Sequence, residues 1–159
     1  MKKIILAAAL CCGLFSSAQI FEETTSGLVI TIPNEDIIGL GVTFTARPMW
    51  ELGDDLYLGG NLSASLYFIN DEFGGSETVD SPTYIGLGPG IRYYLLEYFY
   101  GGVDTAYNFE INGQAGNGIR FFPHVGYSFE TINLEAGYHL FDAENVDLGG
   151  LAFGIYYKF

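Results

Sequence analysis

A strict alternation of apolar and polar residues between positions 38 and 68 is the feature that most constrains this chain. In residues 38–52 every even-numbered position is apolar, and the positions between them are small or polar except Met49. Gly-Asp-Asp at 53–55 makes a turn, after which the apolar side chains again fall on even-numbered positions in residues 56–68. Because successive side chains of a β-strand point to opposite faces, this pattern predicts a hairpin with one apolar and one polar face.

The polar face of this hairpin indicates a membrane barrel, although a soluble antiparallel sheet has the same period. Each arm has about the nine to eleven residues that a tilted strand needs to cross a bilayer. The apolar face carries no charge, whereas Arg47 and Glu51 lie on the other face. That other face is rich in Gly, Ser, Thr and Asn, which suit a narrow lumen. A secreted soluble β-sandwich is the alternative.

Residues 1–18 have the pattern of a secretory signal peptide. The segment begins with two lysines, continues with an apolar stretch over residues 4–15, and ends in Ser-Ser-Ala. The apolar stretch is too short for a membrane-spanning helix. We therefore expect cleavage between Ala18 and Gln19.

The predicted mature chain, residues 19–159, contains no cysteine, because Cys11 and Cys12 both lie in the signal. It therefore has no disulfide and no thiolate metal site. The formal charge of the chain falls from −13 to −15 when the two lysines leave with the signal. This acidic balance argues against nucleic acid as a partner, since nucleic-acid binding relies on cationic side chains. The cations that remain are Arg47, Arg92, Arg120 and Lys158.

The alternation continues to the end of the chain and predicts eight strands in all. The six outside the first hairpin cover residues 27–32, 83–95, 99–110, 119–129, 132–140 and 149–159. The connections after the second, fourth and sixth strands are tight, and those after the third, fifth and seventh are long and polar. Bacterial outer-membrane barrels have an even number of strands, short periplasmic turns and longer external loops. The pattern thus predicts an all-β, eight-stranded antiparallel up-and-down transmembrane barrel with both termini in the periplasm.

Three prolines within the predicted strands conflict with a closed barrel. Pro48, Pro89 and Pro123 cannot donate to a ladder, and a closed barrel has no edge on which to place them. We expect local bulges at these positions.

The last strand and one internal segment resemble known outer-membrane proteins. Outward apolar residues and a terminal aromatic resemble the signal by which the barrel-assembly machinery recognises its substrates. The residues that carry this pattern are Leu151, Phe153, Ile155, Tyr157 and Phe159. Residues 88–95, Gly-Pro-Gly-Ile-Arg-Tyr-Tyr-Leu, resemble the Gly-Pro-x-x-Arg-Tyr-Tyr element of the family called outer membrane protein beta-barrel domain. The resemblance covers essentially the mature chain. It implies a small barrel of the OmpA and OmpX type in the outer membrane of a Gram-negative bacterium.

The inward face of the predicted barrel supplies an ion-pair core. Arg47 and Arg92 are its cations, and Glu51, Asp104 and Glu135 are the expected partners. We expect Arg92 to meet Asp104, because both lie a similar distance from the turn at residue 97. The other polar groups expected in the lumen are Arg120, His124, His139 and Lys158. Side chains can fill an eight-stranded interior, so the lumen should conduct poorly.

A catalytic or metal site is the less favoured interpretation of these residues. Ser128 lies four residues from His124, but a nucleophile needs its base within hydrogen-bond reach. His124, His139 and Glu135 are spaced along strands without any metal motif. We therefore expect no catalytic residue, no metal and no cofactor. Aromatic girdles at the two membrane interfaces account for the outward rings.

Three functions remain open at this stage. The first is a structural or surface-interaction barrel, in contact with outer-membrane lipids and monomeric, whose acidic loops meet a surface partner. The loop carboxylates are Asp71, Glu72, Glu77, Asp80, Asp142, Glu144 and Asp147. The second is a narrow, porin-like pore or a barrel for hydrophobic-compound uptake. The third is a lipid-modifying outer-membrane enzyme. Interior crowding favours the first.

Overall fold

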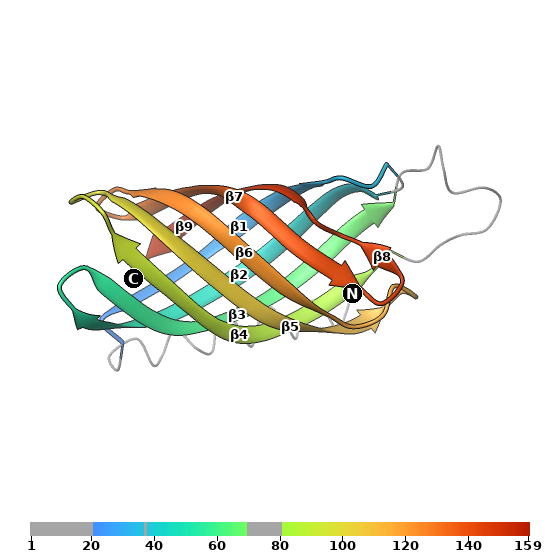
Figure 1. Cartoon of the computed structure of the whole chain (residues 1–159), viewed down its shortest axis with the longest axis horizontal. Helices are drawn as coiled ribbons and strands as arrows, with labels where there is room; N and C mark the ends of the chain where they lie inside the picture. Colours follow the sequence, from blue (N-terminus) through green and yellow to red (C-terminus); the bar gives the residue numbers. More distant parts are fainter. Residues whose placement is uncertain (1–20, 37, 70–80) are drawn as a thin grey trace.

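The chain forms a closed antiparallel β-barrel (Figure 1). The structure is a computed structural model that describes residues 21–36, 38–69 and 81–159. Among these residues the barrel strands are β1 (Glu23–Pro33), β2 (Ile38–Gly53), β3 (Leu56–Ile69), β4 (Thr83–Tyr94), β5 (Phe99–Asn112), β6 (Gly118–Ser128), β7 (Ile132–Ala143) and β9 (Gly150–Lys158). A two-residue strand, β8 (Val146–Asp147), pairs antiparallel with the end of β7. The predicted eight-stranded fold is therefore confirmed. No helix among the described residues is long and apolar enough to cross a membrane.

Pairing between the first and last strands closes the cylinder. Each barrel strand pairs antiparallel with its neighbour in the chain, and β1 pairs with β9, with Leu28 opposite Ile155. Within the described ranges, no barrel strand is left with an unpaired edge that could recruit another chain.

The apolar face of every strand points outward, and the polar face points into the barrel. In β2, the Phe44 side chain is 56% exposed, whereas its neighbour Thr43 is 1% exposed. In β9, Phe153 and Ile155 are about half exposed, whereas Tyr156, on the opposite face of the strand, is buried. A soluble barrel has the reverse arrangement, because water favours polar groups outside. The core of this protein is therefore the lumen.

The connections are sorted between the two ends of the barrel. The turns β2–β3, β4–β5 and β6–β7 are short and lie together at the left of Figure 1. The connections β5–β6 and β7–β9 lie at the other end, where β1 and β3 end and β2 and β4 begin. We call these the turn end and the loop end. The described chain begins and finishes at the turn end, where the Phe159 amide donates to the Thr24 carbonyl at 3.0 Å.

The expectation of bulges at the prolines was wrong. The register of β2 with β3 is the same on both sides of Pro48, and only the ladder pairing beside the proline lapses. Pro89 and Pro123 are accommodated in the same way, on the β5 and β7 sides of their strands. A residue in an antiparallel ladder directs its N–H and C=O to one neighbour, so proline forfeits one bond without moving the chain. The register shifts lie near strand ends instead, in β2 and β4.

β1 and β7 extend furthest beyond the bounds that the sequence predicted. β1 begins at Glu23, four residues before the expected start, because Thr25 continues its inward-facing series and pairs across to Arg47 and Lys158. β7 continues to Ala143, since Phe141 and Ala143 keep the same alternation and turn inward. Both extensions add side chains to the lumen.

Candidate functional site

The lumen gathers the charged side chains of the strands. Arg47, Arg92 and Arg120 come from β2, β4 and β6 and are 2%, 1% and 3% exposed. Lys158, on β9, is half-buried at the turn end and donates to the Ser128 hydroxyl at 2.9 Å. Burying a guanidinium costs several kcal/mol unless partners compensate. The partners of each arginine therefore define the site.

Arg47 is the centre of a charged cluster in the turn-end half of the lumen. Its Nη1 donates to both carboxylate oxygens of Glu135, at 2.7 and 2.8 Å. Its Nη2 donates to the Tyr156 hydroxyl at 2.7 Å and forms an ion pair with Asp104. The guanidinium also lies 4.1 Å from the centre of the Tyr156 ring. Arg47 thereby joins β2 to β5, β7 and β9 through the middle of the barrel.

Glu135 collects donors from four strands. Besides Arg47, the Tyr100 hydroxyl donates to its Oε1 at 2.7 Å. Nη2 of Arg92 and Nε2 of His124 lie 3.9 and 3.7 Å from the same oxygen. Several donors around one fully buried carboxylate offset the cost of removing it from water. Glu135 is thus held as an anion by its surroundings.

Arg92 pairs with a residue that the sequence interpretation missed. It forms an ion pair with Glu23 of β1, and its guanidinium lies 4.5 Å from the centre of the Tyr100 ring. The expected pairing of Arg92 with Asp104 is therefore wrong, since Asp104 pairs with Arg47. The physical reason is the narrow lumen, in which an arginine side chain reaches a distant strand as easily as its neighbour.

Glu23, and not Glu51 as the sequence suggested, is the carboxylate that joins the ion pairs of the lumen. Glu51 is exposed at the turn end, at the last regular pairing before the register shift that ends β2, and it is not part of the buried lumen. Glu23 lies in the segment that looked like a polar lead-in. Its odd number matches the inward series of Thr25, Val29 and Thr31, so extending the alternation backwards would have found it.

A second polar layer lies around Arg120. This arginine donates to the hydroxyls of Ser63 and Ser65 at 2.6 and 3.0 Å, and Thr43 donates to Ser65 at 2.9 Å. Among the described residues no carboxylate lies within 4.0 Å of the Arg120 guanidinium. The layer is therefore stabilised by neutral hydroxyls, unlike the charged cluster.

An apolar cap closes the lumen at the loop end. Tyr84 packs edge-on against Phe141 at 5.0 Å and against Tyr67 at 6.1 Å between ring centres. The buried members of the cap are Ile38, Tyr67, Tyr84, Ala115, Phe141, Ala143 and Leu148. Between the charged cluster and the cap, the Phe122 ring stacks on His124 at 4.8 Å. Side chains thus occupy the described lumen from the charged cluster to the loop end.

The histidines have structural contacts. Nδ1 of His124 lies 3.1 Å from the Phe122 carbonyl oxygen, while Ser128 contacts Lys158. Nδ1 of His139 lies 2.8 Å from the Thr31 hydroxyl. Both histidines are buried, out of reach of a substrate. Within the part of the chain that the structure describes, no three His, Cys, Asp or Glu side chains form a metal-binding group.

The remaining predicted residues lie outside the lumen or outside the described ranges. Phe153, Ile155, Tyr157 and Phe159 all face outward at the end of the chain. The expected cleavage site, Ala18 and Gln19, and the loop carboxylates within residues 70–80 fall outside the described residues. Aromatic side chains are exposed near the turn end, as a girdle requires. They include Trp50, Tyr93, Phe99, Tyr127, Phe129 and Tyr157.

Comparison with solved structures finds small β-barrels. A designed transmembrane β-barrel shares 14% identity with a TM-score of 0.61, over 87% of this chain and 97% of the other. A crystal structure of Ail, the attachment invasion locus protein of Yersinia pestis, shares 14% identity with a TM-score of 0.56, over 86% and 97%. The same outer membrane protein in a phospholipid bilayer nanodisc gives 16% and 0.57 over the same shares. No protein-family model and no curated protein matches the sequence. The comparisons therefore establish the fold, and the resemblance to the beta-barrel domain family stays an expectation.

Replacing Glu135 with alanine should strongly destabilise the barrel. The change leaves Arg47 and Arg92 buried without their shared carboxylate, and breaking a buried pair costs about 3–5 kcal/mol. Urea titration of the barrel refolded into phosphatidylcholine vesicles measures the free energy of unfolding. Glu51→Ala is the matched control, because an exposed side chain should change that energy by no more than about 0.5 kcal/mol. Equal effects of the two substitutions would contradict the role given to the charged cluster.

Proposed function

We propose that this chain is an integral outer-membrane barrel with a structural or surface-interaction role and no catalytic activity. One observation carries the proposal: the barrel is apolar outside, while its lumen is crossed by the Arg47 ion pairs and capped by packed side chains. A barrel of this kind exposes nothing chemical to a substrate. What it offers to other molecules is its loops and its outer wall.

The membrane location is supported by the outward belt. Its exposed apolar side chains lie on every barrel strand, among them Ile30, Leu58, Leu87 and Leu140. A water-soluble protein rarely exposes so large an apolar surface. In the proposed orientation the turn end and both termini lie in the periplasm, and the loop end faces outward, as short turns and longer loops do in known barrels. The predicted signal peptide supplies the export route.

A surface-interaction role is supported by the loop end. Exposed carboxylates of the described loops lie there, on Asp142, Glu144 and Asp147. The similar barrel Ail is named for attachment and invasion. We propose that loops at this end meet a partner, that the chain acts as a monomer, and that the barrel-assembly machinery inserts it.

The purified protein should form no channel. The described lumen is blocked twice, by the charged cluster and by the apolar cap, so ions have no continuous path. Planar-bilayer recording should give the same baseline as a protein-free bilayer with the same detergent. Steady, large single-channel steps would refute the closed barrel and favour the porin-like pore.

A charge on the outer wall should destabilise the barrel if that wall meets lipid. Leu87 on β4 is 61% exposed, so in water Leu87→Arg would be close to neutral. In a bilayer an outward arginine costs about 2–4 kcal/mol near the midplane. Urea titration in phosphatidylcholine vesicles should show this loss for Leu87→Arg but a much smaller one for Leu87→Ala. A neutral Leu87→Arg would argue for the soluble alternative.

Deleting Phe159 should lower the yield of folded barrel in cells. The residue ends the outward aromatic series of β9, which resembles the recognition signal of the assembly machinery. At native expression, the outer-membrane fraction should hold less of the shortened chain than of the full one.

Mass spectrometry of the same fraction should find the mature protein starting at Gln19. Unchanged membrane levels, or a soluble periplasmic mature chain, would count against the assignment.

A further inference from the structure

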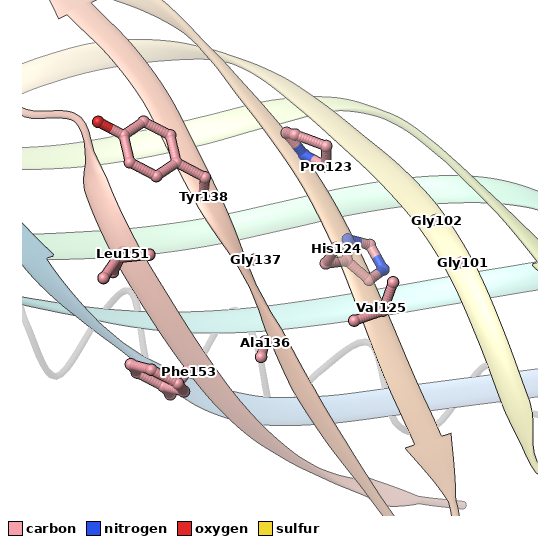
Figure 2. A pocket seen from close by; sticks show the side chains of 10 residues that line it. All are labelled: Gly101, Gly102, Pro123, His124, Val125, Ala136, Gly137, Tyr138, Leu151 and Phe153. Carbon is pink, nitrogen blue, oxygen red and sulfur yellow. The ribbon is translucent and has the colours of Figure 1, made fainter.

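The outer wall carries an open groove across β5, β6, β7 and β9. It has a volume of about 640 Å³, and Figure 2 shows the residues that line it. The strand order places it on the side of the barrel away from β3. Its outward side chains are those of Pro123, Val125, Ala136, Tyr138, Leu151 and Phe153. Five of these six are apolar throughout, and none carries a charge. The groove is thus a hollow within the belt that the proposed function places in the membrane.

Small residues at matched positions create the hollow. Gly101, Val125, Ala136 and Phe153 lie side by side along one row of ladder pairs. Glycine and alanine alternate there with larger side chains, so the surface dips at Gly101 and Ala136. A Cβ added at Gly101 would meet no atom within 4 Å.

The wall behind the groove is solid. A Cβ added at Gly137, whose open side faces the lumen, would collide with the Phe122 ring and the Cβ of His124. His124 itself is buried, and its ring packs against Phe122 and Tyr100 inside the barrel. The groove therefore does not lead into the lumen, and whatever fills it must come from the surroundings of the barrel.

One end of the groove is polar. Tyr138 lies on the loop-end side of Ala136, and Figure 2 shows its hydroxyl pointing away from Pro123 and His124. Asn34, in the β1–β2 turn at the loop end, donates through its side-chain amide to that hydroxyl. The groove thus joins an apolar floor near the middle of the wall to a hydrogen-bonding pair at the loop-end rim.

This arrangement matches a membrane lipid in amphipathic character and in direction. We propose that the groove holds one acyl chain of a lipid in the outer leaflet, with the polar end of that lipid at Tyr138 and Asn34. The proposal rests on the membrane location proposed above. An empty apolar hollow forfeits dispersion contacts on one side, and a flexible acyl chain restores them.

A second copy of this chain is a poorer occupant. A stable protein interface buries about 800 Å² on each partner, which six outward side chains do not supply. Within lipid, apolar side chains gain no hydrophobic driving force by meeting each other, because the lipid tails are equally apolar. A specific small ligand would need several converging polar groups, whereas this groove has its polar pair only at the rim.

Photochemical labelling in a bilayer tests the proposal. The mature chain is refolded into phosphatidylcholine vesicles that contain phosphatidylcholine with a diazirine in one acyl chain, irradiated, and mapped by mass spectrometry. Adducts should concentrate on residues 123–125, 136–138 and 151–153 relative to the rest of the outer belt. A diazirine near the ester should label the Tyr138 end, and one farther along the chain should label the Val125 and Ala136 end.

Matched substitutions separate the groove from the belt in general. Ala136→Phe fills the groove and should reduce its labelling to the average of the belt. Ala64→Phe makes the same change on the outer face of β3, four strands away in both directions around the barrel, and should leave the labelling pattern unchanged. Gly101→Leu is a second filling variant at a position with open space. Circular dichroism of each variant in vesicles confirms that it is folded.

The remaining outcomes contradict the proposal in distinguishable ways. Labelling spread evenly over the outer belt, or unaffected by Ala136→Phe and Gly101→Leu, would overturn the lipid groove and leave the membrane location intact. Energy transfer between dye-labelled copies of the chain in the same vesicles that is lost in Ala136→Phe would assign the groove to a second copy. A folded chain without lipid adducts on any strand would overturn the membrane location and the groove together.

Discussion

The bond between Arg47 and Glu135 across the lumen is the interaction on which the interior depends. Both side chains are buried, so the loss of either leaves the other with fewer partners to offset the cost of removing its charge from water. The other partners of these two residues, Asp104 and Tyr100 on β5 and Tyr156 on β9, bring two further strands into the cluster. Because these contacts join strands that are not neighbours in the sheet, they brace the cylinder across its diameter, where ladder bonds cannot act.

The fold was predictable from the sequence because side chains alternate along a β-strand with a period of two residues. In this barrel every strand has one face toward the lumen and the other face outward. Alternation alone assigned the inward or outward face of residues such as Thr43, Phe44 and Phe153, and the structure agrees. Exposure to an apolar surrounding makes this pattern strict, since one outward charge in a strand would be costly. Strand ends were less well defined, as β1 shows.

The partners within the lumen were beyond the reach of the pattern. Alternation states that Arg92 points inward, but it does not state how far a flexible side chain reaches across a narrow interior. Arg92 pairs with Glu23 on β1 and not with a carboxylate of the neighbouring strand. Glu23 lies in a segment whose composition suggested no strand. The prolines show a similar limit. The sequence shows that each proline lacks a donor, but it does not show that the lost bond leaves the register of the strand unchanged.

The pairing of β1 with β9 has a consequence for the order of assembly. Leu28 and Ile155 face each other although most of the chain separates them, so this contact has a very high contact order. Until β9 is in place, β1 and β7 each have an unpaired backbone edge. The ion pair between Glu23 and Arg92 then lies in a cylinder that is not yet closed. Contacts between such distant residues are slow to form. The barrel is thus vulnerable to wrong strand pairing for as long as the nine residues of β9 remain unpaired.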